Sequence, residues 1–234
     1  MNAIAIVLVA AFFGLPQLGQ HPVPLPAKFD PAKCVECHSD KQQGKYVHTA
    51  MAGGCTTCHT INTKDGATTI GLVAPPEQLC VTCHPLSTGV SVHPPYAEKQ
   101  CVVCHSPHSS NFVAHTRAGT NALCLACHGE RKEEGTSVEV FEGQKIPMGE
   151  YASAPKIQLD PSGRVGHPFM GHPVAGMPDP LRKGEALSCL SCHEHHTASI
   201  PPLLQASWKS VTICDQCHQA AKAAQSTKPK GPKP

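Results

Sequence analysis

The sequence predicts a mostly irregular fold with short α-helices and little β-structure. Aromatic side chains make up only 4% of the 234 residues, whereas proline (23) and glycine (19) are plentiful. A chain so poor in aromatic residues and so rich in turn formers has little material for an ordinary hydrophobic core. Fourteen cysteines and 16 histidines are the other unusual feature. We therefore expect bound groups, held by these residues, to fill much of the interior.

The cysteines fall into seven pairs, each with two residues between its members, and a histidine directly follows every pair. A disulfide framework is the first interpretation for a secreted chain, and a series of zinc sites for a cytosolic one. Neither of these needs the histidine. The seven motifs are Cys34/Cys37/His38, Cys55/Cys58/His59, Cys80/Cys83/His84, Cys101/Cys104/His105, Cys124/Cys127/His128, Cys189/Cys192/His193 and Cys214/Cys217/His218.

This Cys-x-x-Cys-His pattern is the attachment sequence of c-type haem. Positions i, i+3 and i+4 share one face of a helical turn. The two thiols can therefore reach the vinyl groups on one haem edge, while the histidine lies under the iron as an axial ligand. The sequence thus predicts seven covalently bound haem c groups, each with the motif histidine as its proximal iron ligand.

The haem propionates would change the charge of the protein. The formal charge of the chain is +2, and fourteen ionised propionates would bring it to about −12. A negative holoprotein disfavours nucleic acid as a ligand. We expect redox protein partners with basic docking surfaces.

Six of the seven motifs form three doubled units. The two first cysteines of a unit are 25, 23 and 25 residues apart, in units that begin their motifs at Cys55, Cys101 and Cys189. The motif at Cys34 stands alone before them. A histidine that we call the leading histidine precedes each unit; these are His48, His93 and His172.

The sequence resembles multihaem c-type cytochromes with doubled CXXCH motifs, which are relatives of the class III cytochromes c. The resemblance rests on "HPPYAEKQCVVCHSPHSS" followed by "NALCLACHG", and on "GHPV" followed by "LSCLSCHEHHTAS" and "TICDQCH". It covers roughly residues 30–220. It implies a chain wrapped around stacked haems, two histidines on each iron, and electron transfer outside the cytoplasm.

Nine histidines remain after the seven proximal ones, and seven haems need seven distal ligands. His21 could cap the first haem or belong to the leader, and His195 is crowded by its neighbours. The five methionines fall at no repeated offset, which favours histidine over methionine as the distal ligand. The expected distal ligands are His48, His93, His108, His115, His167, His172 and His196.

The first doubled unit departs from the pattern of the other two. The residue three after its first proximal histidine is Asn62, where the other units have His108 and His196. Either the missing ligand comes from elsewhere in the chain, or one haem has an open coordination position.

The chain divides into a leader, two haem domains and two segments without haem motifs. Residues 1–20 include an apolar run of thirteen, Ala3 to Leu15, which suits a signal peptide and is short for a membrane span. They contain no Lys or Arg and no A-x-A cleavage site, so a retained anchor is the alternative. We predict haem domains over 21–128 and 172–220, a haem-free insertion over 129–171, and a disordered Lys/Pro-rich tail over 221–234.

Within these segments, "SVEVFEGQKIPMGE" suggests a short hairpin, and "NALCLACHGERKEE" and "SVTICDQCHQAAKAAQ" suggest helices. The function expected is electron transfer rather than enzyme catalysis, in an exported protein that is periplasmic or extracellular, with membrane association through the leader as a variant. Two alternatives stay open. One is an oxidoreductase with one open haem; the other is a self-associating subunit of a cytochrome filament or a subunit of a membrane complex.

Overall fold

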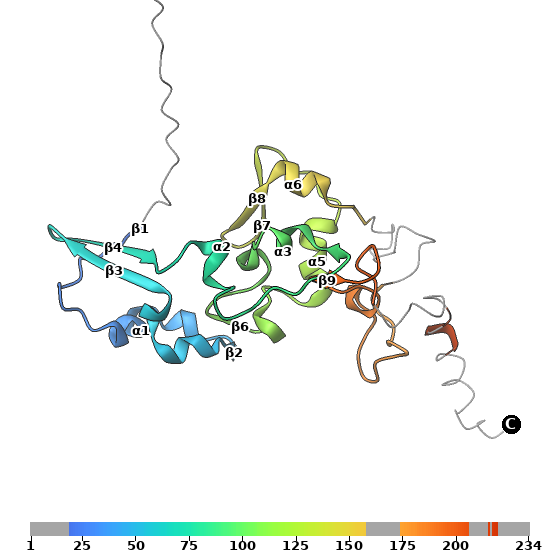
Figure 1. Ribbon diagram of the computed structural model, residues 1–234, viewed down its shortest axis with the longest axis horizontal. Coiled ribbons are helices and arrows are strands. Elements are labelled where there is room, and N and C mark those ends of the chain that lie inside the picture. The colour runs from blue at the N-terminus through green and yellow to red at the C-terminus, as the bar shows by residue number, and fades with distance from the viewer. Residues whose placement is uncertain (1–18, 158–173, 206–214, 216, 220–234) are drawn as a thin grey trace, which may run out of the picture.

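The computed structural model describes residues 19–157, 174–205, 215 and 217–219. Its elements follow the long axis in roughly chain order, from the hairpin of β3 (His59–Lys64) and β4 (Ala67–Leu72) at one end to β9 (Thr197–Ala198) near the other (Figure 1). The described residues form a mostly irregular fold with short helices and small sheets, as predicted. None of the described helices is long and apolar enough to cross a membrane.

The helices are short. The longest described one is α5 (Thr120–His128), which the sequence predicts over a longer stretch. It ends at His128 because Gly129 turns to an extended conformation (φ −76°, ψ 142°) while its N–H still donates to Leu125 O at 2.9 Å. The helix expected around residues 210–225 lies largely outside the described residues. The other helices are α1 (Cys34–Cys37), α2 (Pro76–Leu79), α3 (Pro94–Ala97), α4 (Cys101–Cys104) and α6 (Met148–Ser153).

Single 3₁₀ turns supply much of the remaining local order. Here such turns tighten the backbone over three to five residues and connect other elements. They are η1 (Pro31–Lys33), η2 (Ser39–Gln42), η3 (Thr49–Gly53), η4 (Cys55–Thr57), η5 (Val113–His115) and η6 (Cys189–Ser191).

The described strands form four small antiparallel sheets. One has the order β1-β4-β3, with β1 at Gly19–Gln20. Its hairpin closes through Asp65 and Gly66, whose φ angles of 51° and 77° are those of the type I′ turns that match the twist of paired strands. The other sheets pair β2 (Tyr46–Val47) with β6 (Ser109–Ser110), β5 (Ser91–Val92) with β9, and β7 (Ser137–Phe141) with β8 (Gln144–Pro147).

The β7–β8 hairpin confirms the prediction for this stretch and contains most of the buried apolar side chains. Val138, Val140, Ile146 and Tyr151 form one cluster, and Tyr151 donates its hydroxyl to Gly129 O at 2.9 Å. The cluster packs against partly buried residues of the second doubled unit, namely Val103, Ala126 and Cys127. The insertion therefore covers two attachment motifs. Among the described residues, the only other buried apolar side chain is Ala198, which agrees with the small core that the composition predicts.

Replacing Val138 by alanine is expected to lower the free energy of unfolding by about 1.5–3 kcal/mol, because two buried methyl groups are lost and a cavity remains. Val90→Ala is the matched control, since Val90 is 75% exposed and Val138 is 1% exposed. The expected change for the control is within about 0.5 kcal/mol. Guanidinium unfolding of the holoprotein, followed by far-UV circular dichroism, measures both. Equal losses in the two variants would contradict a core at this hairpin.

Candidate haem sites

The attachment motifs lie on single turns of the backbone. In several motifs the histidine donates its backbone N–H to the carbonyl of the first cysteine, as in His38 to Cys34 at 2.9 Å and His105 to Cys101 at 2.9 Å. Helices α1, α4 and α5 carry three motifs, and the turns η4 and η6 begin two others. One turn brings positions i, i+3 and i+4 to the same face. Two thiols and an imidazole can therefore approach one planar group.

Thiols of consecutive motifs lie close enough to influence one another's ionisation. Burial, and then the neighbouring charge of Cys55, raises the pKa of Cys34, while a hydrogen bond with Cys189 raises the pKa of Cys124. Each motif therefore lies beside the next one along the chain, with the seventh motif represented by Cys217. These electrostatic interactions join Cys34 to Cys55, Cys58 to Cys80, Cys80 to Cys101, Cys104 to Cys127, Cys124 to Cys189, and Cys192 to Cys217.

Some attachment residues lie at the surface of the described structure. Cys37 and Cys83 are exposed, whereas the other described motif cysteines are half-buried. The motif histidines His38, His84 and His218 are exposed as well. Cys83 belongs to a stretch, residues 82–90, that is exposed throughout. The roles of the motif cysteines in haem attachment and of the histidines as iron ligands stay predictions.

Five motif histidines face a histidine from outside the motifs at nearly the same distance. The centroids of the two imidazole rings are 6.0 or 6.1 Å apart in every case. The pairs are His38 with His21, His59 with His108, His84 with His48, His105 with His196, and His128 with His93.

This constant spacing fits an iron ion between the rings. Ordinary aromatic pairs spread over about 4.5–7 Å, and other histidine ring contacts here are 4.3, 4.4 and 5.4 Å. An imidazole nitrogen binds a transition metal at about 2 Å, so two rings facing one ion have centroids about 6 Å apart once the ring radii are added. The residues present therefore fit six-coordinate haem iron with two histidine ligands.

Backbone carbonyls orient several of the motif imidazoles. The Nδ1–H groups of His105 and His128 each donate at 2.8 Å, to Ala114 O and Pro155 O, and that of His193 donates to Pro202 O at 3.0 Å. His59 makes a longer bond of the same kind, 3.3 Å to Gly71 O. A hydrogen bond at Nδ1 fixes the tautomer and leaves Nε2 unprotonated to bind a metal.

Burial lowers the pKa of four of the facing histidines, which favours their neutral form. Burial, reinforced by neighbouring histidines, lowers the pKa of His48, His93 and His108. The same causes lower the pKa of His196 to about 4. Metal binding requires the neutral imidazole, so burial keeps these rings in the form that binds iron.

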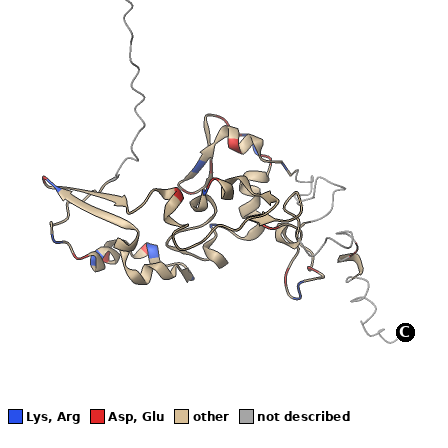
Figure 2. Ribbon diagram, in the orientation of Figure 1, with Lys and Arg blue, Asp and Glu red and all other residues tan. Residues whose placement is uncertain are grey.

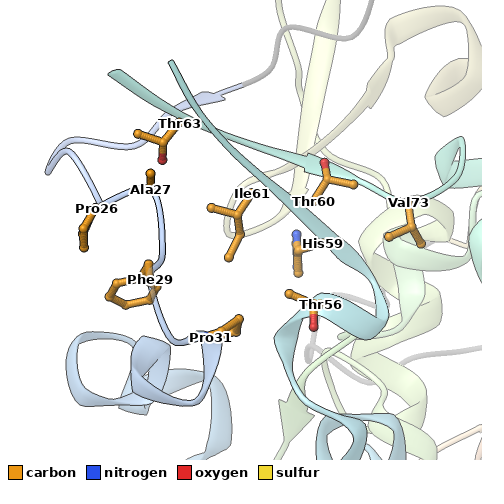
Figure 3. Close-up of a pocket in the computed structure, with 10 residues that line it drawn as sticks. All are labelled: Pro26, Ala27, Phe29, Pro31, Thr56, His59, Thr60, Ile61, Thr63 and Val73. Carbon is orange, nitrogen blue, oxygen red and sulfur yellow. The ribbon is translucent and has the colours of Figure 1, made fainter. Parts of the chain in front are cut away.

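Two cavities border histidines of these pairs. One, of about 420 Å³, is lined by His59 and by apolar side chains that include Phe29, Ile61 and Val73 (Figure 3). The other, of about 390 Å³, is lined by His48, Val47 and Met51. Both fall within the range of about 300–1,000 Å³ for ligand sites. The space beside these two histidines is therefore large enough for a sizeable apolar group.

The remaining candidate residues lie in different surroundings, and some lie outside the described residues. The ring of His115 lies 5.4 Å from that of His48, and its buried Nδ1 has no hydrogen-bond partner. His21, which is not among the seven distal ligands expected above, faces His38, and its Nδ1–H donates to Val23 O at 2.6 Å. His195 is exposed beside His196. The predicted residues His167, His172 and Cys214 lie outside the described residues.

A row of turns that each present two thiols and an imidazole, most of them facing a second imidazole at a fixed distance, defines a multihaem c-type cytochrome. The family model for the doubled CXXCH motif matches residues 48–87, 93–133 and 179–226, which together make up more than half of the chain. The chain therefore belongs to this doubled-CXXCH-motif family. The first two matched segments begin at the leading histidines His48 and His93. No curated protein and no solved structure gives a significant match.

Proposed function

We propose that the protein relays electrons through seven covalently bound c-type haems, each with two histidine ligands on its iron. The observation that carries this proposal is the set of five histidine pairs with ring centroids 6.0 or 6.1 Å apart. Every one of these pairs includes the histidine of an attachment motif. The proposal extends to all seven motifs because each has the same residue types at the same spacing.

The chain contributes position, orientation and shielding to such a relay. Electron tunnelling falls steeply with distance, so the row of neighbouring motifs supports short steps between consecutive haems. Two histidines per iron leave no position for a substrate and lower the potential relative to a histidine–methionine pair. The carbonyl bonds at Nδ1 hold several proximal rings in place, and burial favours the neutral form of His48, His93, His108 and His196.

The docking partners would be redox proteins with basic surfaces, acting in the periplasm or outside the cell. The support is the charge of about −12 that fourteen propionates would give the chain. Over the described residues, Lys and Arg are scattered along the ribbon rather than gathered on one element (Figure 2). Haem attachment in this class takes place beyond the inner membrane, which supports export. Donor and acceptor would meet the relay at its ends, where the first and seventh motifs lie and where Cys37 and His218 are exposed.

A carbon monoxide titration of the dithionite-reduced holoprotein tests the relay. No shift of the Soret band is expected, because every iron would already have two protein ligands. The haem count, measured by the pyridine haemochrome method and intact mass, should equal the seven motifs of the sequence. A wild-type shift equivalent to one haem in seven would contradict the relay and favour an oxidoreductase. His108→Ala is the positive control, since it removes one of the facing histidines.

A further inference from the structure

Short strand pairs connect consecutive units and bring two histidines together. Strand β2 ends directly before His48, and its partner β6 begins directly after His108. The backbone N–H of His48 donates to His108 O at 2.8 Å. We call this strand pair, with its two flanking histidines, the first joint.

The second joint repeats this arrangement one unit later. Strand β5 ends directly before His93, and its partner β9 begins directly after His196. The backbone N–H of His93 donates to His196 O at 2.9 Å. In each joint, the leading histidine of one unit therefore lies beside a histidine of the next unit. This second histidine stands three residues after the first proximal histidine of that next unit.

A glycine makes close approach possible in both joints. Gly44 and Gly89 each lie four residues before the leading histidine. A Cβ at Gly44 would lie 2.5 Å from Ser110 N, and one at Gly89 would lie 2.7 Å from Ala198 O. Because these neighbours are backbone atoms of β6 and β9, a side chain could be accommodated only by separating the strands.

The two histidines of a joint face the two motifs of a single unit. In the first joint, His48 faces His84 and His108 faces His59. In the second, His93 faces His128 and His196 faces His105. We propose that each joint supplies both distal iron ligands of one doubled unit, so that the second motif takes the leading histidine of its own unit and the first motif takes a histidine from the next unit. This proposal rests on the proposed haem relay and assigns its ligands.

The lone first motif fits the same rule with one haem instead of two. Strand β1 ends before His21, whose N–H donates to Thr68 O at 2.8 Å. Thr68, which is fully buried, thus occupies the place that His108 and His196 have in the joints. His21 faces His38 at 6.0 Å and acts as the leading histidine of a unit that has a single motif. One iron needs one distal ligand, so no second histidine is required.

This explains Asn62 without an open haem. In the proposed rule, the histidine three residues after a proximal histidine is the distal ligand for the first motif of the preceding unit. The lone motif already has its leading histidine as distal ligand, so it needs no histidine from the next unit. Asn62 is exposed on β3 and pairs with Thr69 across the hairpin. The proximal histidine of its own unit, His59, instead faces His108.

Crossed variants of the full-length holoprotein test the assignment. His108→Ala and His48→Ala should each allow one reduced haem in seven to bind carbon monoxide. In a background that lacks the second haem, Cys55→Ala with Cys58→Ala, the His108→Ala variant should bind none, while His48→Ala should still bind one equivalent. The reverse pattern, or binding in both, would overturn the pairing. His195→Ala and Asn62→His are controls that should bind no carbon monoxide.

Electron paramagnetic resonance of the oxidised protein provides a second readout if the haem-deleted backgrounds do not fold. The anisotropy of a low-spin ferric haem depends on the angle between its two imidazole planes, which is 68° for His21 and His38 but 17° for His59 and His108. His21→Gly should remove a highly anisotropic component and His108→Gly a rhombic one, and added imidazole should restore six-coordination. Unchanged spectra would overturn the assignment. Fewer than seven haems or carbon monoxide binding in the wild type would instead refute the relay itself.

Discussion

Replacing Gly44 with alanine is expected to release both proposed distal ligands of the first doubled unit at once. The added Cβ would lie 2.5 Å from Ser110 N and 2.8 Å from Ser110 O, which are backbone atoms that cannot rotate away. Strands β2 and β6 would have to separate, and His48 and His108 flank these strands. Reduced Gly44→Ala protein should therefore bind carbon monoxide at two haems in seven. The overpacking itself should lower the free energy of unfolding by about 1–3 kcal/mol.

Gly89→Ala should have the same effect on the second unit, because its Cβ would meet Ala198 O at 2.7 Å. Gly149→Ala is the matched control. A Cβ at Gly149 has nothing within 4 Å, and the residue lies in helix α6. Alanine favours a helix over glycine by roughly 1 kcal/mol, so this variant should be as stable as the wild type or more so. If Gly44→Ala binds no more carbon monoxide than Gly149→Ala does, the joint does not hold the two ligands.

Replacing Asp179 with asparagine is expected to loosen the sixth attachment turn. The Asp179 carboxylate is 5% exposed and accepts a hydrogen bond from Ser191 Oγ at 2.6 Å. Its other oxygen accepts the backbone N–H groups of Leu181 at 2.8 Å and Arg182 at 3.2 Å. Ser191 lies in the turn η6 and its Oγ accepts the N–H of Ser188 at 3.1 Å, which fixes the start of that turn. The carboxylate therefore connects the preceding loop to the attachment motif.

An amide oxygen accepts weaker hydrogen bonds than a carboxylate oxygen. The amide also replaces one of the two accepting oxygens with an NH₂ group, which would then face a hydrogen-bond donor. We expect Asp179→Asn to lower the free energy of unfolding by about 2–4 kcal/mol. Asp65→Asn, on the exposed hairpin turn with φ 51°, is the matched control, since asparagine tolerates this conformation. Thermal unfolding of the holoprotein followed by circular dichroism compares the two. Equal midpoints would show that the buried carboxylate does not support the turn.

The attachment motifs could be predicted from the sequence because they are local. Two thiols and a histidine within five residues share a face of any helical turn, whatever the rest of the chain does. The same holds for the β7–β8 hairpin, whose alternating side chains and closing glycine lie within one short stretch. The length of α5 was harder to predict, because the residues after Gly129 have good helix propensity. Gly129 ends the helix where its N–H meets Leu125 O.

The exposure of individual motif residues could not be predicted from the motif itself. Cys80 is half-buried and Cys83 is exposed, although both belong to one turn. Exposure depends on which segments pack beside a turn, and residues 82–90 are all exposed. Spacing within a motif does not specify this.

The role of His21 had only a weak signal in the sequence. Its equivalence to His48 and His93 depends on the strand that precedes each of them and on the partner of that strand. Once the joints are known, the spacing of Gly44 from His48 and of Gly89 from His93 becomes a sequence signature. It occurs again at Gly163 and His167, outside the described residues.

The sequence by itself determined the class of the protein, the seven attachment motifs, their doubling and the surplus of histidines. Those features depend on residue identity and on spacing within one turn. The tertiary structure decided which histidine faces which motif, and that the motifs follow one another in a row. His105 and His196 belong to different units, and their rings face each other because strand β5 of one unit pairs with strand β9 of the other. Contacts of that kind depend on how distant segments pack, which local spacing does not specify.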